Sequence, residues 1–330
     1  MPEAAEPQPV GRLGPAQVGS RVVVRRVVRG ETGPTGGPAF TDVLGVMESW
    51  ADGVTTVRRA DGSVVTIRTA DIVSGKPVPP RASRFSRLSV EAVERRAAGM
   101  FRPDLAVRLG AWMLRLSGGV NRRPSSVLAV GDPGMPLDDA LEEAVRFYAA
   151  HGAVPCAQVV VGSAVQEQLE AQGWPRLDAE EADTDVMLAG IAALSRRLGG
   201  HDTSAVQHAD TLSRDWLVGN DRALASYDAV ARNLDLPDAV FASLSEGGRQ
   251  VARARVNLVD DWALLADLTV HPDRRRSGLA RILTADLAGW AAEHGASTML
   301  LQVQSDNEPA LALYASLGFE RHHSYRYLRG

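Results

Sequence analysis

The chain has 330 residues, a formal net charge of −4 at pH 7 and 45% hydrophobic residues. Its length predicts two or three domains, and its apolar content is sufficient for a sizeable core. The small net charge argues against a nucleic acid or an anionic membrane surface as the partner.

The cysteine content and the hydropathy of the chain predict the cellular compartment of the protein. The chain has one cysteine, Cys156, so it can form no intramolecular disulfide, and we expect this thiol to be a small core residue. No stretch reaches the roughly 20 apolar residues that a membrane helix requires. The first residues lack the basic start and apolar core of a signal peptide. The sequence therefore predicts a cytoplasmic protein.

Residues 1–80 predict a lead-in followed by a small barrel. Residues 1–16 are rich in Pro, Ala and Glu and are expected to be flexible. Residues 17–80 contain about five short strand patterns, two of which flank the hairpin signal Asp61-Gly62. The Pro-rich stretch 76–80 predicts a stiff spacer at the boundary. We therefore expect an all-β, SH3-like barrel over 17–80.

Two arginine pairs in this barrel, Arg25-Arg26 and Arg58-Arg59, have two interpretations. They suit a nucleic-acid surface, or they are solvated faces of ordinary strands. The second interpretation is favoured because the net charge of the barrel is only mildly positive, so no nucleic-acid partner is expected.

The rest of the chain is mixed α/β sequence in which one order of elements occurs twice. In both 84–198 and 201–330, an amphipathic helix ends at a His-Gly pair, and a strand, a second helix and a Gly-aromatic pair follow. The pairs are residues 151–152 and 173–174 in the first half, and 294–295 and 318–319 in the second. Matching order and spacing indicate a duplication, with chance similarity as the alternative.

Residues 268–280 are the most informative about chemistry. A strand expected over 262–270 runs through a Pro- and Arg-containing loop into a helix beginning near Gly278, and 275–280 fit the pattern R-x-x-G-x-A/G. Such a loop turns backbone N–H groups inward at the positive end of a helix dipole, which forms a cradle for a pyrophosphate. Gly278 lets the backbone approach the phosphates closely. From this segment alone, a solvated arginine cluster is the alternative.

With Asn307, Tyr314 and the downstream run LALYASLGF (311–319), residues 262–328 resemble the GCN5-related N-acetyltransferase (GNAT) family. In that family the strand, loop and helix bind acetyl-CoA. The resemblance implies that this co-substrate contacts Leu268, Val270, Arg275, Arg276, Ser277, Gly278, Leu279, Ala280, Asn307 and Tyr314.

The wider layout resembles an actinobacterial group that has an SH3-like domain, a degenerate acetyltransferase half and an intact one. The expected fold class is therefore α+β, a mixed α/β GNAT fold in which 84–198 is a degenerate half and 201–330 the intact domain. Asp132 lies in the first half where the second has its arginines. A carboxylate there would repel a pyrophosphate, so we expect no CoA in the first half.

The resemblance also suggests catalytic groups. Tyr314 is the candidate general acid, and the N–H of Val270 is placed to support the oxyanion. The strand 262–270 is expected to splay from its neighbour and open a slot for pantetheine. The identity of the general base stays open, because some relatives place Glu where this chain has Gln302. Asp267 is either a base that acts through a water molecule or a carboxylate with only a capping role. A substrate amine of low pKa would need no base.

No metal site is expected. His322 and His323 are adjacent, and on a regular strand they face opposite sides and cannot bind one metal ion together. His271 is expected to be a turn residue.

Together these features predict an acetyl-CoA-dependent N-acetyltransferase acting by direct attack of a small-molecule or protein amine. The alternatives are a mycothiol-synthase-like acetyltransferase and a non-catalytic acetyl-CoA-sensing module. The acceptor pocket is expected to come from residues 221–261 and from the first half. The identity of the acceptor and the oligomeric state stay open.

Overall fold

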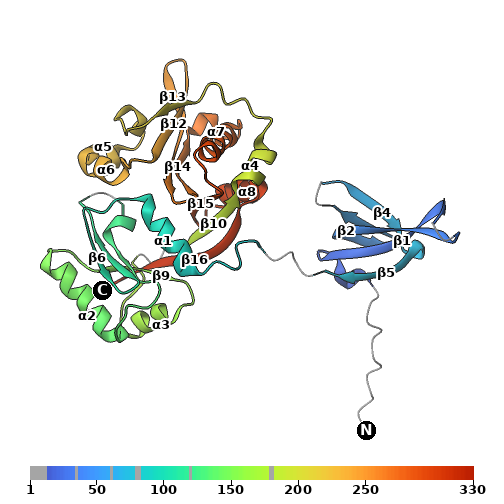
Figure 1. Ribbon diagram of the computed structural model, residues 1–330, viewed down its shortest axis with the longest axis horizontal. Coiled ribbons are helices and arrows are strands. Elements are labelled where there is room, and N and C mark those ends of the chain that lie inside the picture. Colours follow the sequence, from blue (N-terminus) through green and yellow to red (C-terminus); the bar gives the residue numbers. More distant parts are fainter. Residues whose placement is uncertain (1–12, 34–35, 60–61, 79–82, 119–120, 178–181) are drawn as a thin grey trace, which may run out of the picture. The chain divides into compact units, whose positions relative to one another are not determined.

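The computed structural model describes residues 13–33, 36–59, 62–78, 83–118, 121–177 and 182–330 (Figure 1). It has two compact units, Met1–Ser83 and Arg84–Gly330. Most of the predicted lead-in, Asp61 of the predicted hairpin and residues 79–80 of the predicted spacer lie outside the described residues. No helix in the described ranges combines the length and the apolar character needed to cross a membrane.

The first unit is an antiparallel sheet with strand order β4-β3-β2-β1-β5 in its described part. Its strands are β1 (Arg21–Thr32), β2 (Pro38–Ala51), β3 (Val54–Arg58), β4 (Val64–Arg68) and β5 (Ile72–Pro77). Alternate apolar residues of the strands, such as Val22, Val24 and Val43, have no exposed surface and form its core. On the opposite face Arg25 pairs with Asp42 at 2.8 Å, as expected of a solvated strand face.

The described part of the second unit contains an eleven-stranded sheet in the order β11-β12-β13-β14-β15-β10-β16-β9-β8-β7-β6. Its strands are β6 (Leu105–Leu109), β7 (Trp112–Leu116), β8 (Val127–Leu128), β9 (Cys156–Val160), β10 (Thr184–Gly190), β11 (Gln207–Ala209), β12 (Ala239–Glu246), β13 (Arg249–Val259), β14 (Trp262–Val270), β15 (Thr298–Gln304) and β16 (Glu320–Arg329). Its helices are α1 (Val90–Ala97), α2 (Leu137–Ala150), α3 (Ala164–Ala171), α4 (Ile191–Leu198), α5 (Asp221–Ala225), α6 (Tyr227–Leu234), α7 (Leu279–Glu293) and α8 (Glu308–Leu317).

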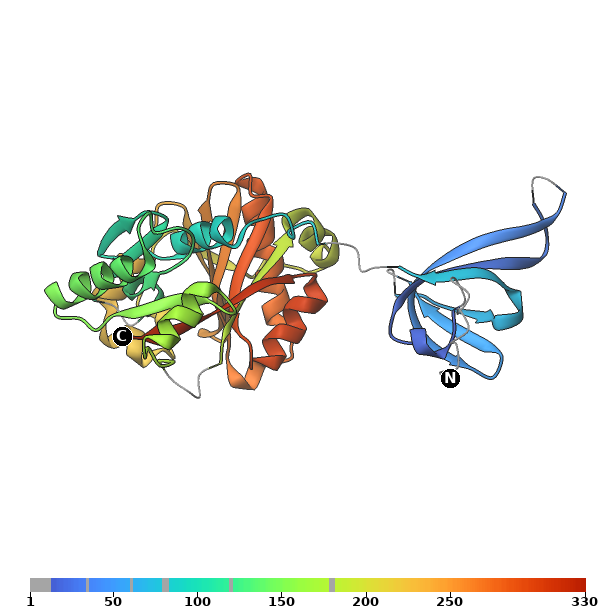
Figure 2. The ribbon, with the colours of Figure 1, turned by 90° about the horizontal axis from the view of Figure 1, so that it is seen from below.

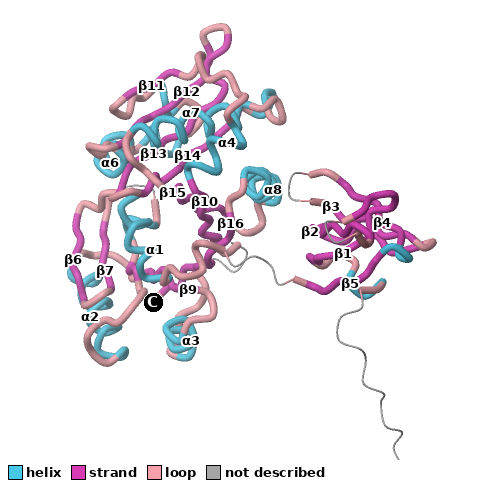
Figure 3. Tube along the Cα trace, turned by 45° about the vertical axis from the view of Figure 1, so that its right-hand side comes forward, coloured by secondary structure: helices cyan, strands magenta, loops and turns pink. Residues whose placement is uncertain are grey.

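Helices cover both faces of the central strands (Figure 3). Met187, Leu265 and Leu301 pack in one buried cluster with residues of α4 and α7. Their neighbours Leu188, Leu264 and Leu300 belong to the opposite cluster, with residues of α1, α5 and α6. Successive side chains of a strand point to opposite faces, and both faces are buried here. The central strands are therefore nearly continuous apolar runs in the sequence.

The two halves of this unit have matching helix ends. At the C-cap of α2 the ring Nδ1 of His151 contacts the carbonyl of Phe147 at 2.7 Å. At the C-cap of α7 the ring of His294 makes the same contact with the carbonyl of Trp290, also at 2.7 Å. The repeated sequence pairs therefore form repeated cap structures.

The second helix of each half ends in the same way, and Tyr314 of the second half therefore corresponds to a leucine of the first half. The N–H of Trp174 donates to the carbonyl of Leu169 at 3.0 Å, and the N–H of Phe319 donates to the carbonyl of Tyr314 at 3.0 Å. Leu169 thus occupies the position in the first half that Tyr314 occupies in the second. The first half therefore has no phenol at this position.

The halves exchange their last strands. β10, which follows the helices of the first half, pairs with β15 and β16 of the second. β16 in turn pairs with β9 of the first half, from Tyr325↔Val160 to Arg329↔Cys156. In Figures 1 and 2 the red strand β16 reaches the green segments of the first half. The described strands of both halves consequently form one continuous sheet.

Candidate active site

A gap opens where β14 and β15 part. The two strands pair in parallel only from Trp262↔Thr298 to Leu265↔Leu301, although both continue beyond these residues. Asp267, just past the last pair, has a φ of +55°, and the register of β14 against β13 shifts around it. This bulge bends β14 away from β15. The expected splay is confirmed.

The hydrogen-bonding pattern turns the backbone of Val270 into this gap. The N–H of His271 donates to the carbonyl of Val251 at 2.8 Å, so the preceding partners Val270 and Ala252 form a non-hydrogen-bonded pair. In such a pair the N–H and C=O groups point away from the partner strand. The N–H of Val270 therefore points away from β13, toward the side where β15 has separated.

The loop after β14 presents main-chain amides at the start of α7. Arg276 and Gly278 have φ angles of +59° and +87°, and Gly278 is the N-cap of α7. Within the described residues, the N–H groups of Arg276, Ser277 and Gly278 donate no hydrogen bond. The first turn of α7 contains no acidic residue, so nothing there offsets the positive end of the helix dipole.

The side chains of this loop differ in exposure. Arg275, Arg276 and Ser277 are exposed, whereas Leu279 is buried in the core beneath α7. The hydroxyl of Ser277 donates to the carbonyl of Arg274. Of the predicted contact residues in the loop, the arginines thus have accessible side chains, and Leu279 offers only its backbone.

Helix α8 brings Asn307 and Tyr314 to the same gap. Asn307 is the N-cap of α8, and its side-chain oxygen accepts the N–H of Ala310 at 3.2 Å, which leaves its amide nitrogen for other contacts. Tyr314 is 7% exposed and packs edge-on against Phe319, with ring centroids 5.5 Å apart. Burial raises the pKa of its phenol to about 12, so the group is protonated at neutral pH.

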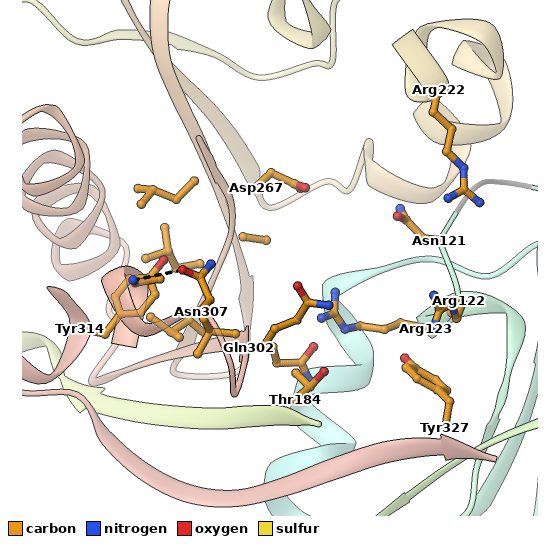
Figure 4. A pocket seen from close by; sticks show the side chains of 17 residues that line it. Asn121, Arg122, Arg123, Thr184, Arg222, Asp267, Gln302, Asn307, Tyr314 and Tyr327 are labelled. Carbon is orange, nitrogen blue, oxygen red and sulfur yellow. Dashed lines mark hydrogen bonds between the residues drawn. The ribbon is translucent and has the colours of Figure 1, made fainter. Parts of the chain in front are cut away.

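One cavity of about 450 Å³ extends from this gap toward the first half. Its lining comprises Asn121, Arg122, Arg123, Thr184, Arg222, Leu265, Ala266, Asp267, Leu268, Leu301, Gln302, Val303, Gln304, Asn307, Ala310, Tyr314 and Tyr327. Figure 4 shows Tyr314 and Asn307 at one end and the arginines at the other, with Asp267 and Gln302 between them. Four predicted site residues, Asp267, Leu268, Asn307 and Tyr314, thus meet around one cavity.

The remaining predicted site residues, Val270 and 275–280, do not line this cavity. Val270 and Arg275 line a second hollow of about 380 Å³ beside the loop. Residues 276–280 line neither of these two cavities.

Asp267 is an ion-pair partner. Its Oδ2 accepts the Nε–H of Arg255 at 2.6 Å, and the Arg255 side chain has no exposed surface. One oxygen of the Asp267 carboxylate is therefore engaged by a buried guanidinium. About 43% of the Asp267 side chain stays exposed, so its other oxygen is open to the cavity.

Gln302 is held by a chain of hydrogen bonds. The Nε–H of Arg123 donates to the Tyr325 hydroxyl at 2.7 Å, and that hydroxyl donates to Oε1 of Gln302 at 3.3 Å. Because its oxygen accepts from Tyr325, Gln302 has its amide N–H groups available on the other side. Gln302 therefore offers donors to the cavity and no proton acceptor of carboxylate strength.

The three arginines of the cavity were not identified from the sequence. Arg222 lies in the expected acceptor segment 221–261, while Arg122 and Arg123 lie in the first half, and both regions were expected to contribute. The chain contains 36 Lys and Arg residues, so composition does not distinguish these three. The strand exchange places them together, because it positions the first half beside β15.

Two predictions are wrong. A bulge in β16 skips His322 in the pairing with β10, so His322 and His323 do not face opposite sides: their Nδ1 atoms are 2.8 Å apart. His323 also contacts the buried Glu94 at 2.8 Å, whose second oxygen accepts from Gln158. Both imidazoles are thus used in hydrogen bonds, and no group of three or more metal-binding side chains occurs in the described part of the chain.

The second wrong prediction concerns Cys156. Its thiol is half-buried rather than in the core, because the residue is the first of β9 and lies at the end of the sheet.

Comparison with known proteins agrees with this geometry. Residues 89–328 match the family "Probable histone acetyltransferase Rv0428c C-terminal", and residues 16–76 match "Rv0428c N-terminal Sm-like domain". The chain belongs to the Rv0428c family. An Sm-like domain resembles an SH3-like barrel, so the expected all-β domain followed by a mixed α/β GNAT fold is confirmed.

Relatives of this Rv0428c-family chain include N-acetyltransferases. It is 25% identical over 251 residues to "Uncharacterized N-acetyltransferase YobR" of Bacillus subtilis, covering 73% of this chain and 99% of YobR. It is 40% identical over 76 residues to the ribosomal protein bS18-alanine N-acetyltransferase of Escherichia coli K12, covering 23% of this chain and 51% of that enzyme. A solved GCN5-related N-acetyltransferase from Kribbella flavida has the same fold, with a TM-score of 0.53, 19% identity and coverage of 76% and 96%.

Proposed function

We propose that the protein is an acetyl-CoA-dependent N-acetyltransferase that forms an amide by direct attack of an amine on the acetyl thioester. The observation that carries this proposal is the separation of β14 from β15 beyond Leu265↔Leu301, with Tyr314 on the wall of the resulting cavity. The relatives reported above support acetyl transfer to an amine in general.

The loop at 275–280 fits the diphosphate of this co-substrate. Amides of Arg276, Ser277 and Gly278 without a partner in the described chain are donors that a phosphate satisfies. Arg276 and Gly278 both have left-handed φ angles in this loop, and a Cβ at Gly278 would meet nothing within 4 Å. The exposed side chains of Arg275 and Arg276 add charge-assisted contacts.

Residues at the gap between β14 and β15 divide the chemistry among them. Acetyl-CoA supplies an acetyl thioester. The N–H of Val270 stabilises negative charge on the carbonyl oxygen while the C–N bond forms and the C–S bond breaks. Tyr314 donates its proton toward the departing sulfur, and the burial that raises its pKa also raises the basicity of a thiolate beside it. The proton lost by the amine passes to water, with Asp267 as the candidate acceptor.

The Asp267–Arg255 ion pair and the amide at Gln302 favour a second candidate function. Neither residue is a free carboxylate, so a module that binds acetyl-CoA without turnover is the alternative. A mycothiol-synthase-like acceptor is a further alternative, and the predicted cytoplasmic location stays a prediction.

Release of free thiol from acetyl-CoA, followed with a panel of amines that includes the acceptor of mycothiol synthase, tests the proposal. Turnover of any amine that is lost in Tyr314→Phe supports the transferase. Tight acetyl-CoA binding with no thiol release from any amine supports the sensor. Absence of acetyl-CoA binding by calorimetry would remove both.

A further inference from the structure

The end of the 450 Å³ cavity remote from Tyr314 is rich in positive charge. Arg122 and Arg123 reach it from the first half, and Arg222 reaches it from α5 (Figure 4). Asp267 is the one carboxylate among the described lining residues, and the buried Arg255 already pairs with it. The lining therefore has two positive charges in excess.

Two of these arginines differ in how they are held. Arg123 is half-buried, and its bond to the Tyr325 hydroxyl fixes the orientation of its guanidinium, leaving the terminal nitrogens toward Gln302 in Figure 4. Arg222 is exposed and forms no ion pair or hydrogen bond with the rest of the described chain. The cavity thus has one pre-positioned guanidinium and one that is available to a ligand.

The neutral groups at this end add donors. The Gln302 oxygen accepts from Tyr325, so its amide N–H groups face the remaining space. Guanidinium and amide donors together match the oxygens of a carboxylate or a phosphate, which accept several such bonds at once.

Between these donors and Tyr314 lies Asp267, whose second oxygen is open to the cavity. The open oxygen of this carboxylate can accept a hydrogen bond from an amine and place it near the gap between β14 and β15. The cavity thus has a hydrogen-bond acceptor for an amine beside the reacting end and a positive wall beyond it.

We propose that the acceptor is an amine that also carries an anionic group, a carboxylate or a phosphate, which the Arg122–Arg123–Arg222 wall binds while the amine lies at Asp267. This inference rests on the proposed function, because it names the acceptor class of the same site. The same wall repels a strongly basic acceptor such as a lysine-rich histone peptide.

Matched amine pairs test the inference. For the carboxylate arm, β-alanine is compared with β-alaninamide; for the phosphate arm, phosphoethanolamine is compared with ethanolamine; a lysine-rich histone peptide is the basic probe. The full chain is assayed for thiol release with each, as wild type, Arg222→Ala, Arg222→Glu and the control Arg108→Ala. Arg108 is exposed on the edge strand β6 and lines neither cavity.

The anionic member of at least one pair should have a kcat/KM about tenfold or more above its neutral partner, since hydrogen bonds to charged groups are worth roughly that factor or more. Arg222→Ala should remove most of this advantage and Arg222→Glu should reverse it, with acetyl-CoA affinity retained, and Arg108→Ala should match the wild type with every amine. Equal rates within both pairs, preference for the basic peptide, or weaker acetyl-CoA binding in Arg222→Ala would overturn the inference.

A binding measurement separates this inference from the proposed function. Calorimetry of the same amines against the protein with saturating CoA requires no turnover. If no amine is acetylated but the anionic amines bind in an Arg222-dependent manner, the transferase fails and the anion wall stands. If amines are acetylated without regard to their charge, the transferase stands and the anion wall fails.

Discussion

Replacement of glycine by alanine should have opposite effects on stability at two positions of α7, its N-cap Gly278 and the interior residue Gly289. Gly278 has a φ of +87°, whereas Gly289 lies inside α7 with an ordinary helical conformation, and a Cβ at either position would meet nothing within 4 Å. Since neither alanine clashes, the backbone alone decides the effect. The left-handed conformation should cost Gly278→Ala about 1 kcal/mol, while Gly289→Ala should gain about 0.5–1 kcal/mol from its higher helix propensity.

Thermal unfolding and calorimetry with acetyl-CoA measure the two effects. A change of about 1 kcal/mol corresponds to a shift in Tm of roughly 2–4 °C for a unit of this size, downward for Gly278→Ala and upward for Gly289→Ala. Because Gly278 lies in the loop that presents the amides, only Gly278→Ala should weaken acetyl-CoA binding, by up to about fivefold for a strain of about 1 kcal/mol. Shifts of the same sign, or equal affinities in the two variants, would refute the assignment of Gly278 to the cradle.

The remaining predictions concern catalysis, the core and metals. Tyr314→Phe should lower kcat by about 100-fold or more with little change in acetyl-CoA affinity; a matched loss of affinity would reduce Tyr314 to a packing role. Because burial raises the pKa of Tyr314 to about 12, wild-type kcat should not fall through phenol ionisation in the neutral to mildly alkaline range. Glu94→Ala leaves His323 and Gln158 without their buried partner and should reduce the free energy of unfolding in urea by about 3 kcal/mol; an unchanged midpoint would contradict this. Treatment with a chelator should leave turnover unchanged, and recovery of lost activity by added metal would show a site that the sequence did not predict.

Local signals in the sequence predicted most elements of the second unit. β14 begins and ends where expected, and α7 begins at Leu279, next to the predicted Gly278, and ends at Glu293, beside the predicted His-Gly pair, because caps and apolar runs specify them locally. The exchange of β10 and β16 was not predicted. Which strand pairs with which depends on contacts between residues more than 100 positions apart, and no short motif encodes that choice.

The site likewise contains residues that the sequence predicted and residues that only the structure revealed. Asp267, Leu268, Asn307 and Tyr314 were predicted because they lie within residues 262–328, which resemble the GNAT family, and they meet at one cavity. The anion wall was found only in the structure. His322 was misjudged because alternation along a strand assumes a regular pleat, and a bulge breaks it.

Strand exchange also has a consequence for synthesis of the chain. β10 has buried residues throughout, and both of its neighbours, β15 and β16, are made more than 100 residues later. At roughly 5–20 residues per second, the ribosome exposes this apolar segment for several seconds or more with both edges open. The nascent protein should therefore depend on a chaperone at 184–190 and acquire its acetyltransferase fold only late in translation.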